Sequence, residues 1–266
     1  MDLGLRDASV IITAASAGIG LEAARSFVAE GANVTITGRS RERLDAAVAD
    51  LAAAGPGTVH GVVGDMADPA VPADLVSEVI ARNGRVDVLV NNVGRAVQAS
   101  FAEVTDAEWD ELWNLNVMSY VRMIREAVPG MVERGSGVIV NVSSTAGKRP
   151  SPGMPHYSVT KAAVQSLSRL VADTYAGSGI RSMAICPGPA RTPAWLDEGG
   201  LADQVAERKG ISAGDALAAT GAGRPIGRMA EPEEIAAAIV FAASPRSSYA
   251  TGAAWSVDGG SVPSIV

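Results

Sequence analysis

The sequence predicts a doubly wound α/β fold, a parallel sheet of about seven strands with helices on both faces, in a single domain. Two observations predict it. Short runs rich in Val, Ile and Thr alternate with longer segments rich in Ala, Leu, Glu and Arg, which is typical of a parallel sheet with crossover helices. Most of the short runs are almost continuously apolar, as expected of strands buried on both faces. Such a sheet binds its ligands at the carboxyl edge.

The expected elements follow in order along the chain. The strands are residues 9–13, 33–37, 58–63, 86–90, 137–142, 180–186 and 254–257, and helices lie between them, for example at 20–30, 41–54 and 107–133. Glycines at 31, 55, 135 and 179 come just after helical stretches, where helices commonly end. Residues 193–228 interrupt the alternation and contain no strand. Because this segment follows the sixth strand at the carboxyl edge, we interpret it as a lid over the site.

Composition limits the class of protein. The chain of 266 residues is 47% hydrophobic and 19% charged, which suits one globular domain with a large core. No apolar run approaches the ~20 residues that cross a membrane, and no secretory signal is visible. The single cysteine, Cys186, suits the cytoplasm. A formal charge of −7 disfavours nucleic-acid binding, and one cysteine with two histidines makes no metal cluster.

The turn after the first strand has the composition of a phosphate site. Residues 13–20 read Thr-Ala-Ala-Ser-Ala-Gly-Ile-Gly and lead directly into a helix. Small residues let the backbone approach a pyrophosphate, whose charge then lies at the helix N-terminus. Glycines also simply make turns, but the strand–turn–helix context favours a dinucleotide.

Tyr157 and Lys161 are candidates for acid–base chemistry. Four residues apart at the start of a helix, they project from one face. The ordinary pKa of a tyrosine, about 10, is too high for proton transfer near neutrality, and a nearby ammonium lowers it. Ser144, at the end of the fifth strand, could donate a hydrogen bond to a substrate oxygen; Ser143 is the competing candidate.

These motifs resemble those of the short-chain dehydrogenase/reductase family over essentially the whole chain. Residues 13–20 resemble its Thr-Gly-x-x-x-Gly-x-Gly signature, Asn91-Asn92-Val93-Gly94 its Asn-Asn-Ala-Gly, and Tyr157 with Lys161 its Tyr-x-x-x-Lys pair. The resemblance implies a Rossmann fold, a nicotinamide cofactor, oxidation or reduction between an alcohol and a carbonyl, and a homotetramer or homodimer. The family spacing from serine to tyrosine selects Ser144.

The resemblance also assigns residues to roles. It implies that Asn116 holds a helix irregularity and a water that relays protons, completing a catalytic set with Ser144, Tyr157 and Lys161. Besides Tyr157 and Lys161, the cofactor-binding residues it implies are Thr13, Ser16, Gly18, Ile19, Gly20, Arg39, Asp65, Met66, Asn91, Gly94, Pro187, Gly188 and Thr192.

Two positions bear on the cofactor. Ala14 stands where the family has its first glycine, and because a side chain disfavours positive φ we expect negative φ there. At the end of the second strand an NAD site places an acidic residue, whereas this chain has Gly38 followed by Arg39. A guanidinium can hold the 2′-phosphate with two parallel hydrogen bonds, which favours NADP(H).

We therefore expect an NADP(H)-dependent oxidoreductase that acts on a small carbonyl or secondary alcohol. One alternative is a 3-oxoacyl carrier-protein reductase, but Gly135 and Ser178 stand where basic residues would meet an acidic carrier. The alternative from another class is a catalytically silent nucleotide sensor. The substrate is not specified, although seven residues are candidates for its pocket: Arg95, Gln98, Thr145, Lys148, Arg149, Met154 and Trp195.

Overall fold

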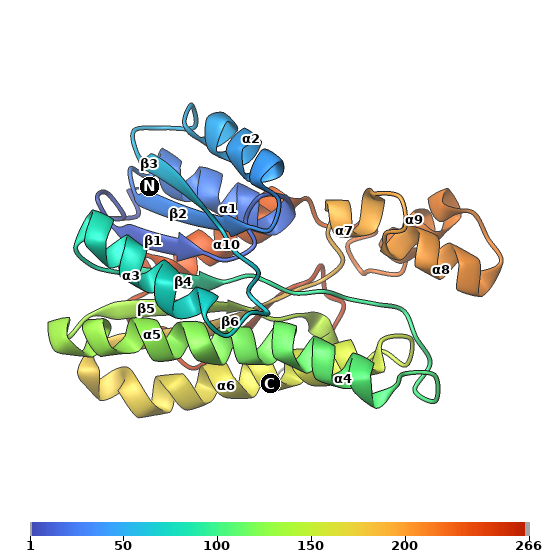
Figure 1. Cartoon of the computed structure of the whole chain (residues 1–266). Coiled ribbons are helices and arrows are strands. Elements are labelled where there is room, and N and C mark those ends of the chain that lie inside the picture. The colour runs from blue at the N-terminus through green and yellow to red at the C-terminus, as the bar shows by residue number, and fades with distance from the viewer. Residues whose placement is uncertain (1, 264–266) are drawn as a thin grey trace.

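All seven predicted strands are present and pair in parallel in one sheet, which confirms the doubly wound fold. The computed structural model describes residues 2–263. Its strand order is β3-β2-β1-β4-β5-β6-β7 (Figure 1). The strands are β1 (Ser9–Ile12), β2 (Asn33–Gly38), β3 (Thr58–Val63), β4 (Val88–Asn91), β5 (Gly137–Val142), β6 (Ile180–Pro187) and β7 (Ala254–Val257). The order reverses beside β1, so a crevice forms at its carboxyl end.

Helices cover both faces of the sheet and enclose two hydrophobic cores. On one face, α1 (Gly18–Ala29), α2 (Arg41–Leu51) and α10 (Pro232–Ala243) bury residues such as Phe27, Leu44 and Ile239. On the other, α3 (Val71–Asn83), α5 (Ser119–Arg134) and α6 (Pro155–Tyr175) bury Tyr120 and Met131 among others. Short 3₁₀ turns complete the chain at Thr145–Gly147, Ala176–Ser178 and Pro245–Ser247.

The helix predicted at residues 107–133 is not continuous. It consists of α4 (Asp106–Trp113), a π-helical turn (Asn114–Met118) and α5. The apolar pattern does not reveal this turn, because both helices share one buried face. Three of the four glycines follow helix ends as predicted, and Gly31, Gly135 and Gly179 have positive φ there. Gly55 instead allows a close approach, since a Cβ there would lie 2.5 Å from the Cα of Ala29.

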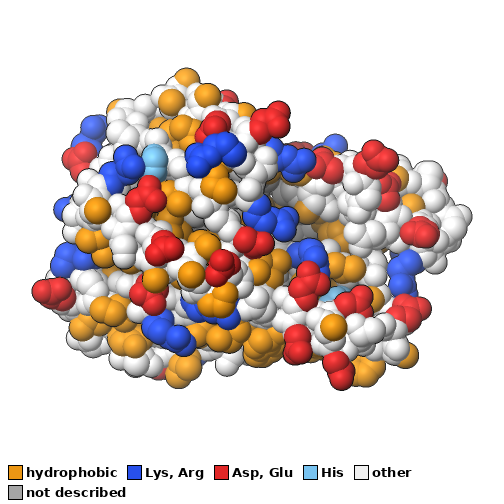
Figure 2. All heavy atoms as spheres, in the orientation of Figure 1, with side chains coloured by type: hydrophobic (Ala, Val, Ile, Leu, Met, Phe, Trp, Pro, Cys, Tyr) orange, Lys and Arg blue, Asp and Glu red, His pale blue; other side chains and the backbone are white. Residues whose placement is uncertain are grey.

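Residues 193–228 form three short helices and no strand. These are α7 (Pro193–Leu196), α8 (Leu201–Lys209) and α9 (Ala213–Ala222). Figure 1 shows α8 and α9 projecting beyond the carboxyl edge of the sheet, and Figure 2 shows a hollow between them and the sheet body. Among the described residues, no helix is long and apolar enough to span a membrane.

Candidate active site

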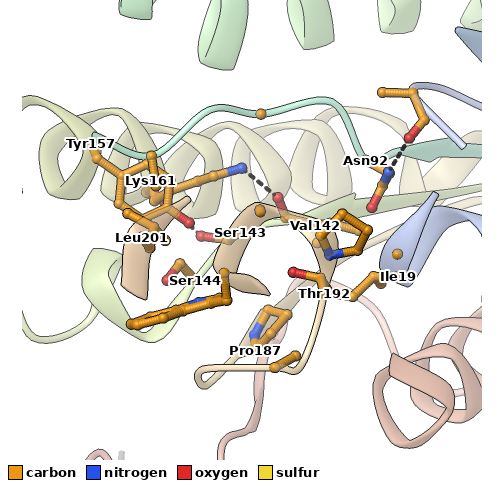
Figure 3. Close-up of a pocket in the computed structure, with 18 of the residues that line it drawn as sticks. Ile19, Asn92, Val142, Ser143, Ser144, Tyr157, Lys161, Pro187, Thr192 and Leu201 are labelled. Atoms are coloured by element: carbon orange, nitrogen blue, oxygen red, sulfur yellow. Dashed lines mark hydrogen bonds between the residues drawn. The ribbon is translucent and has the colours of Figure 1, made fainter. Parts of the chain in front are cut away.

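Two adjoining cavities open at the carboxyl edge of the sheet. The first, of about 300 Å³, lies between the turn after β1, the loop after β4, the end of β5, α6 and the loop after β6 (Figure 3). Nine of the predicted site residues line it: Gly18, Ile19, Gly94, Ser144, Tyr157, Lys161, Pro187, Gly188 and Thr192. Of the seven candidates for the substrate pocket, Trp195 lines both cavities and Thr145, Arg149 and Met154 line the second.

The glycine turn leaves room where a phosphate would lie. Gly18 has φ of 59°, and a Cβ on Gly20 would lie 2.5 Å from Nδ2 of Asn92 and 2.9 Å from Cα of Ala15. No side chain caps the N-terminus of α1, so its first N–H groups remain available to an anion. With Gly94 and Gly188 on the same cavity, this cradle fits the pyrophosphate and nicotinamide ends of a dinucleotide.

The prediction of negative φ at Ala14 is wrong. Ala14 has φ of 52°, in the left-handed region that an alanine occupies at a cost of about 1–2 kcal/mol. Hydrogen bonds on both sides hold it there. Its N–H donates to Oγ1 of Thr37 (2.9 Å), and its carbonyl accepts from Nδ2 of Asn92 (3.0 Å). The turn therefore keeps a left-handed backbone without glycine.

Thr13 and Asn91 bind neighbouring strands together and do not line the cavity. The hydroxyl of Thr13 accepts from the backbone N–H groups of Asn92 (2.9 Å) and Val93 (3.2 Å). Asn91 on β4 donates from Nδ2 to Oδ1 of Asn141 on β5 (2.9 Å). Asn92, which the sequence prediction omitted, does line the cavity. Asn91 therefore joins two strands of the sheet, and Asn92 lies at the cavity.

Four predicted cofactor residues lie outside this cavity, near the ends of β1 to β3. Arg39 is exposed just after β2, and a Cβ on Gly38 would lie 3.1 Å from Oγ of Ser16. Asp65 is exposed, and its Oδ1 accepts from the N–H of Ala67 (3.0 Å). Met66 is 2% exposed and packs in the core, so its side chain does not face a ligand.

Lys161 is buried, and its ammonium contacts protein oxygens. Nζ donates to the carbonyl of Val142 (2.8 Å) and to the hydroxyl of Tyr120 (3.4 Å). Gly94 leaves space for it, because a Cβ there would lie 3.1 Å from Nζ. Burial lowers the pKa of Lys161 to about 7. The amine therefore changes its charge near neutrality. Tyr120 was not singled out by the sequence.

Tyr157 and Ser144 both line the cavity. Burial raises the pKa of Tyr157, and the polar hydroxyl of Ser144 opposes that rise. The lowering of this pKa that we expect from Lys161 does not outweigh burial. Nζ lies 5.9 Å from the centre of the Tyr157 ring, and its own charge is weakened by burial. Desolvation of the phenol is the larger effect.

The choice of Ser144 over Ser143 has a structural reason. The hydroxyl of Ser143 donates to the carbonyl of Lys161 (2.8 Å) and accepts from Nε2 of Gln165 (3.1 Å), so it fixes α6 against β5. Ser144 accepts from the N–H of Ala146 (3.1 Å), which starts the 3₁₀ turn. Its proton remains free to donate toward the cavity.

Asn116 lies in the π-helical turn and is fully buried. Its Nδ2 donates to the carbonyl of Arg95 and to Oγ1 of Thr160, both at 3.1 Å, and its Oδ1 accepts from the N–H of Arg95 (3.0 Å). This clamp joins the loop after β4 to α6. Its side chain does not line either cavity, so it acts on the site through the backbone.

Comparisons with known proteins agree with this geometry. Residues 13–261 match the family described as enoyl-(acyl carrier protein) reductase. The chain is 38% identical to an uncharacterized oxidoreductase, YvrD, of Bacillus subtilis over the whole of both chains. It is 34% identical to the 3-oxoacyl-[acyl-carrier-protein] reductase of Thermotoga maritima, covering 95% of this chain and 96% of that one.

A solved structure extends the likeness to the fold. L-Sorbose reductase from Gluconobacter frateurii, complexed with NADPH and L-sorbose, superposes with a TM-score of 0.93 at 35% identity, over 100% of both chains. The whole chain therefore has the fold and the length of a known reductase. The chain belongs to the short-chain dehydrogenase/reductase family.

Proposed function

We propose that this protein is an NADP(H)-dependent reductase or dehydrogenase that interconverts a carbonyl and a secondary alcohol. One observation carries the proposal: Ser144, Tyr157 and Lys161 line a cavity whose opposite wall is the glycine cradle of α1. Gly18, Gly94, Gly188 and Thr192 would hold the dinucleotide, which supplies a hydride to the carbonyl carbon when bound.

The residues of this chain handle the proton. Ser144 donates a hydrogen bond to the substrate oxygen and orients it toward Tyr157. As the carbonyl becomes an alkoxide, the phenol of Tyr157 gives its proton to that oxygen, and the product is an alcohol. In the opposite direction the phenolate accepts the proton. The amine of Lys161 lies near the ring of Tyr157. Asn116 holds the loop that contains Gly94 through its hydrogen bonds with the backbone of Arg95.

Arg39 supports the choice of NADP(H). It stands after Gly38 at the carboxyl end of β2, where an acidic residue would repel a 2′-phosphate. We expect Arg39→Gln to lower the preference for NADPH over NADH about 10- to 100-fold, the loss of one or two charge-assisted hydrogen bonds. Arg41→Gln is the matched control, because Arg41 pairs with Asp45 on exposed α2.

The test is a spectrophotometric panel of carbonyls and alcohols with both cofactors, applied to the wild type and these two variants. Oxidation of NADPH with several carbonyls supports the proposal. Binding of NADPH with no turnover across the panel would favour the silent sensor. A carrier-linked 3-oxoacyl substrate, compared with the same ketone free in solution, separates the carrier-protein reductase from the reductase proposed here.

Three further points belong to this proposal. Residues 193–228 act as a lid, because Trp195, Leu201 and Thr220 from that segment line the substrate cavity. A homodimer or homotetramer is supported by exposed apolar side chains on α6, with Leu170 62% exposed and Val159 47%. A cytoplasmic location is supported by the single cysteine.

A further inference from the structure

The charged side chains that line the second cavity are all positive. The cavity has a volume of about 440 Å³ and shares Ser144, Tyr157 and Trp195 with the first, so it extends from the proposed reacting centre. Its two charged side chains are Arg149 and Arg224, and no acidic side chain of the described residues lines it. The volume is in the range of small-molecule sites.

The side chain of Arg224 has a buried donor, Nε, that no described residue accepts from. Its Nε is buried and makes no hydrogen bond with any described residue, which costs about 1–3 kcal/mol or more for a charged group. Around Arg224, Arg228 and Glu234 form an ion pair at 2.6 Å. The carboxylate of Asp258 accepts from the N–H groups of Gly260 and Val262, both at 3.0 Å. Both acids line a third cavity together with Arg224, but Glu234 is paired with Arg228, and Asp258 accepts only backbone N–H groups there.

Several arginines outside this cavity have carboxylate partners. Four border the same edge of the molecule and form ion pairs: Arg95 with Glu111, Arg191 with Glu231, Arg208 with Glu103, and Arg228 with Glu234. Within the described part of the chain, neither Arg149 nor Arg224 forms an ion pair. Arg149, which is exposed, and the partly buried Arg224 therefore line the second cavity with no carboxylate to neutralise them.

We propose that the substrate carries an oxyanion, a carboxylate or phosphate, and that Arg224 with Arg149 binds it while the carbonyl lies between Ser144 and Tyr157. This inference rests on the function proposed above and names its substrate class. A guanidinium binds either group with two parallel hydrogen bonds, which are stronger in a partly desolvated cavity. The hydroxyls of Thr220 and Ser261, which also line this cavity, already donate to the carbonyls of Ala216 and Asp258, so the guanidinium groups are the donors for the anion.

The experiment compares carbonyl substrates that differ only in the anion. Keto acids with the carboxylate two to four bonds from the carbonyl are reduced with NADPH beside their methyl esters, and phosphorylated ketones beside their unphosphorylated forms. The variants are Arg224→Gln and Arg149→Gln. Arg208→Gln is the control, because Arg208 pairs with Glu103 and lines neither cavity.

We expect the wild type to prefer one anionic series over its neutral partner, and the better of the two series identifies carboxylate or phosphate. Arg224→Gln lowers kcat/KM for that series about 10- to 100-fold through KM, the loss expected for a hydrogen-bonded charge, and changes the neutral series less than about threefold. The free anion, acetate or inorganic phosphate, competes with a neutral ketone at saturating NADPH in the wild type but not in Arg224→Gln. NADPH binding and circular dichroism stay unchanged.

Two outcomes contradict the proposal, and they are distinguishable. If neutral ketones are reduced as well as their anionic partners, or Arg224→Gln lowers both series equally, the oxyanion site is wrong while the reductase stands. If the wild type binds NADPH but reduces neither series nor any neutral carbonyl, the reductase itself is wrong.

Discussion

The two sides of the substrate cavity differ in how their side chains are held. On the wall that contains Ser144, Tyr157 and Lys161, the proposed catalytic residues, Lys161 is 3% exposed and donates to the carbonyl of Val142 on β5. Behind this wall Asn116 is 0% exposed and ties the loop after β4 to α6. Residues 193–228, the proposed lid, meet the rest of the protein partly through surface contacts such as Arg208 with Glu103 (3.3 Å).

The difference indicates a division of labour. Groups that transfer a proton need a fixed position, and buried hydrogen bonds with every donor satisfied provide it. Groups that select a substrate can stand on a segment with fewer constraints, where changes leave the chemistry intact. In the function proposed above, the wall determines the reaction type, and residues 193–228 together with Arg149 determine the substrate.

The largest difference in stability is expected between two substitutions that each remove a side-chain amide bonded to a backbone N–H, one at Asn116 and one at Gln204. Asn116→Ala removes three hydrogen bonds, two of them to the partly buried backbone of Arg95 and one to the buried hydroxyl of Thr160, so we expect it to lower the free energy of unfolding by about 2–4 kcal/mol. Gln204→Ala removes the corresponding bond between Gln204 on α8 and the N–H of Gln98 (3.0 Å), with an expected cost below about 1 kcal/mol. Urea unfolding at one protein concentration measures both. Equal losses would contradict the comparison.

An intermediate effect on stability is expected from the titration of Lys161. Its folded-state pKa of about 7 lies below the ordinary 10.5, so burial disfavours the ammonium. The folded state favours the neutral amine. Lys161 therefore contributes fully to the free energy of unfolding above pH 10.5, and this contribution is lost as the pH falls toward 7. The amine should titrate near neutrality, and the chain has only Lys148, Lys161 and Lys209, so NMR of ¹³Cε-labelled lysine resolves it.

Tyr120→Phe sharpens this test. The phenylalanine keeps the ring, which lies 5.4 Å from Nζ, but removes the hydroxyl that accepts from the ammonium. The pKa of Lys161 should therefore fall further below 7. A Lys161 signal that titrates near 10.5 in the wild type, or a pKa that is unchanged or higher in Tyr120→Phe, would contradict the buried hydrogen-bonded arrangement.

The smallest effect is expected at the cofactor turn. Ala14→Gly relieves a left-handed alanine but adds freedom to the unfolded chain, so the two terms partly cancel. We expect a stabilisation of at most about 1 kcal/mol and NADPH binding within about threefold of the wild type. Thermal unfolding and cofactor titration measure these. A clear destabilisation would mean that the Ala14 methyl itself contributes to packing.

The order of elements and most of the site could be predicted because parallel strands bring their carboxyl ends to one edge. Local apolar runs located the strands, and motif spacing selected Ser144. The rest depends on contacts that no spacing encodes. The positive φ of Ala14 is held by Thr37 and Asn92, 23 and 78 residues away. The neighbours of Lys161, Tyr120 among them, come from other elements, and so does the unpaired Nε of Arg224.

The central claim is that Tyr157 transfers the proton while the glycine cradle binds the cofactor. Turnover and NADPH binding of Tyr157→Phe, measured beside Tyr175→Phe from the same helix, test it most directly. The account predicts that kcat falls by about 10²- to 10⁴-fold, as for a lost general acid, with the Kd for NADPH within about threefold and Tyr175→Phe near the wild type. Activity of Tyr157→Phe within tenfold of the wild type would contradict it.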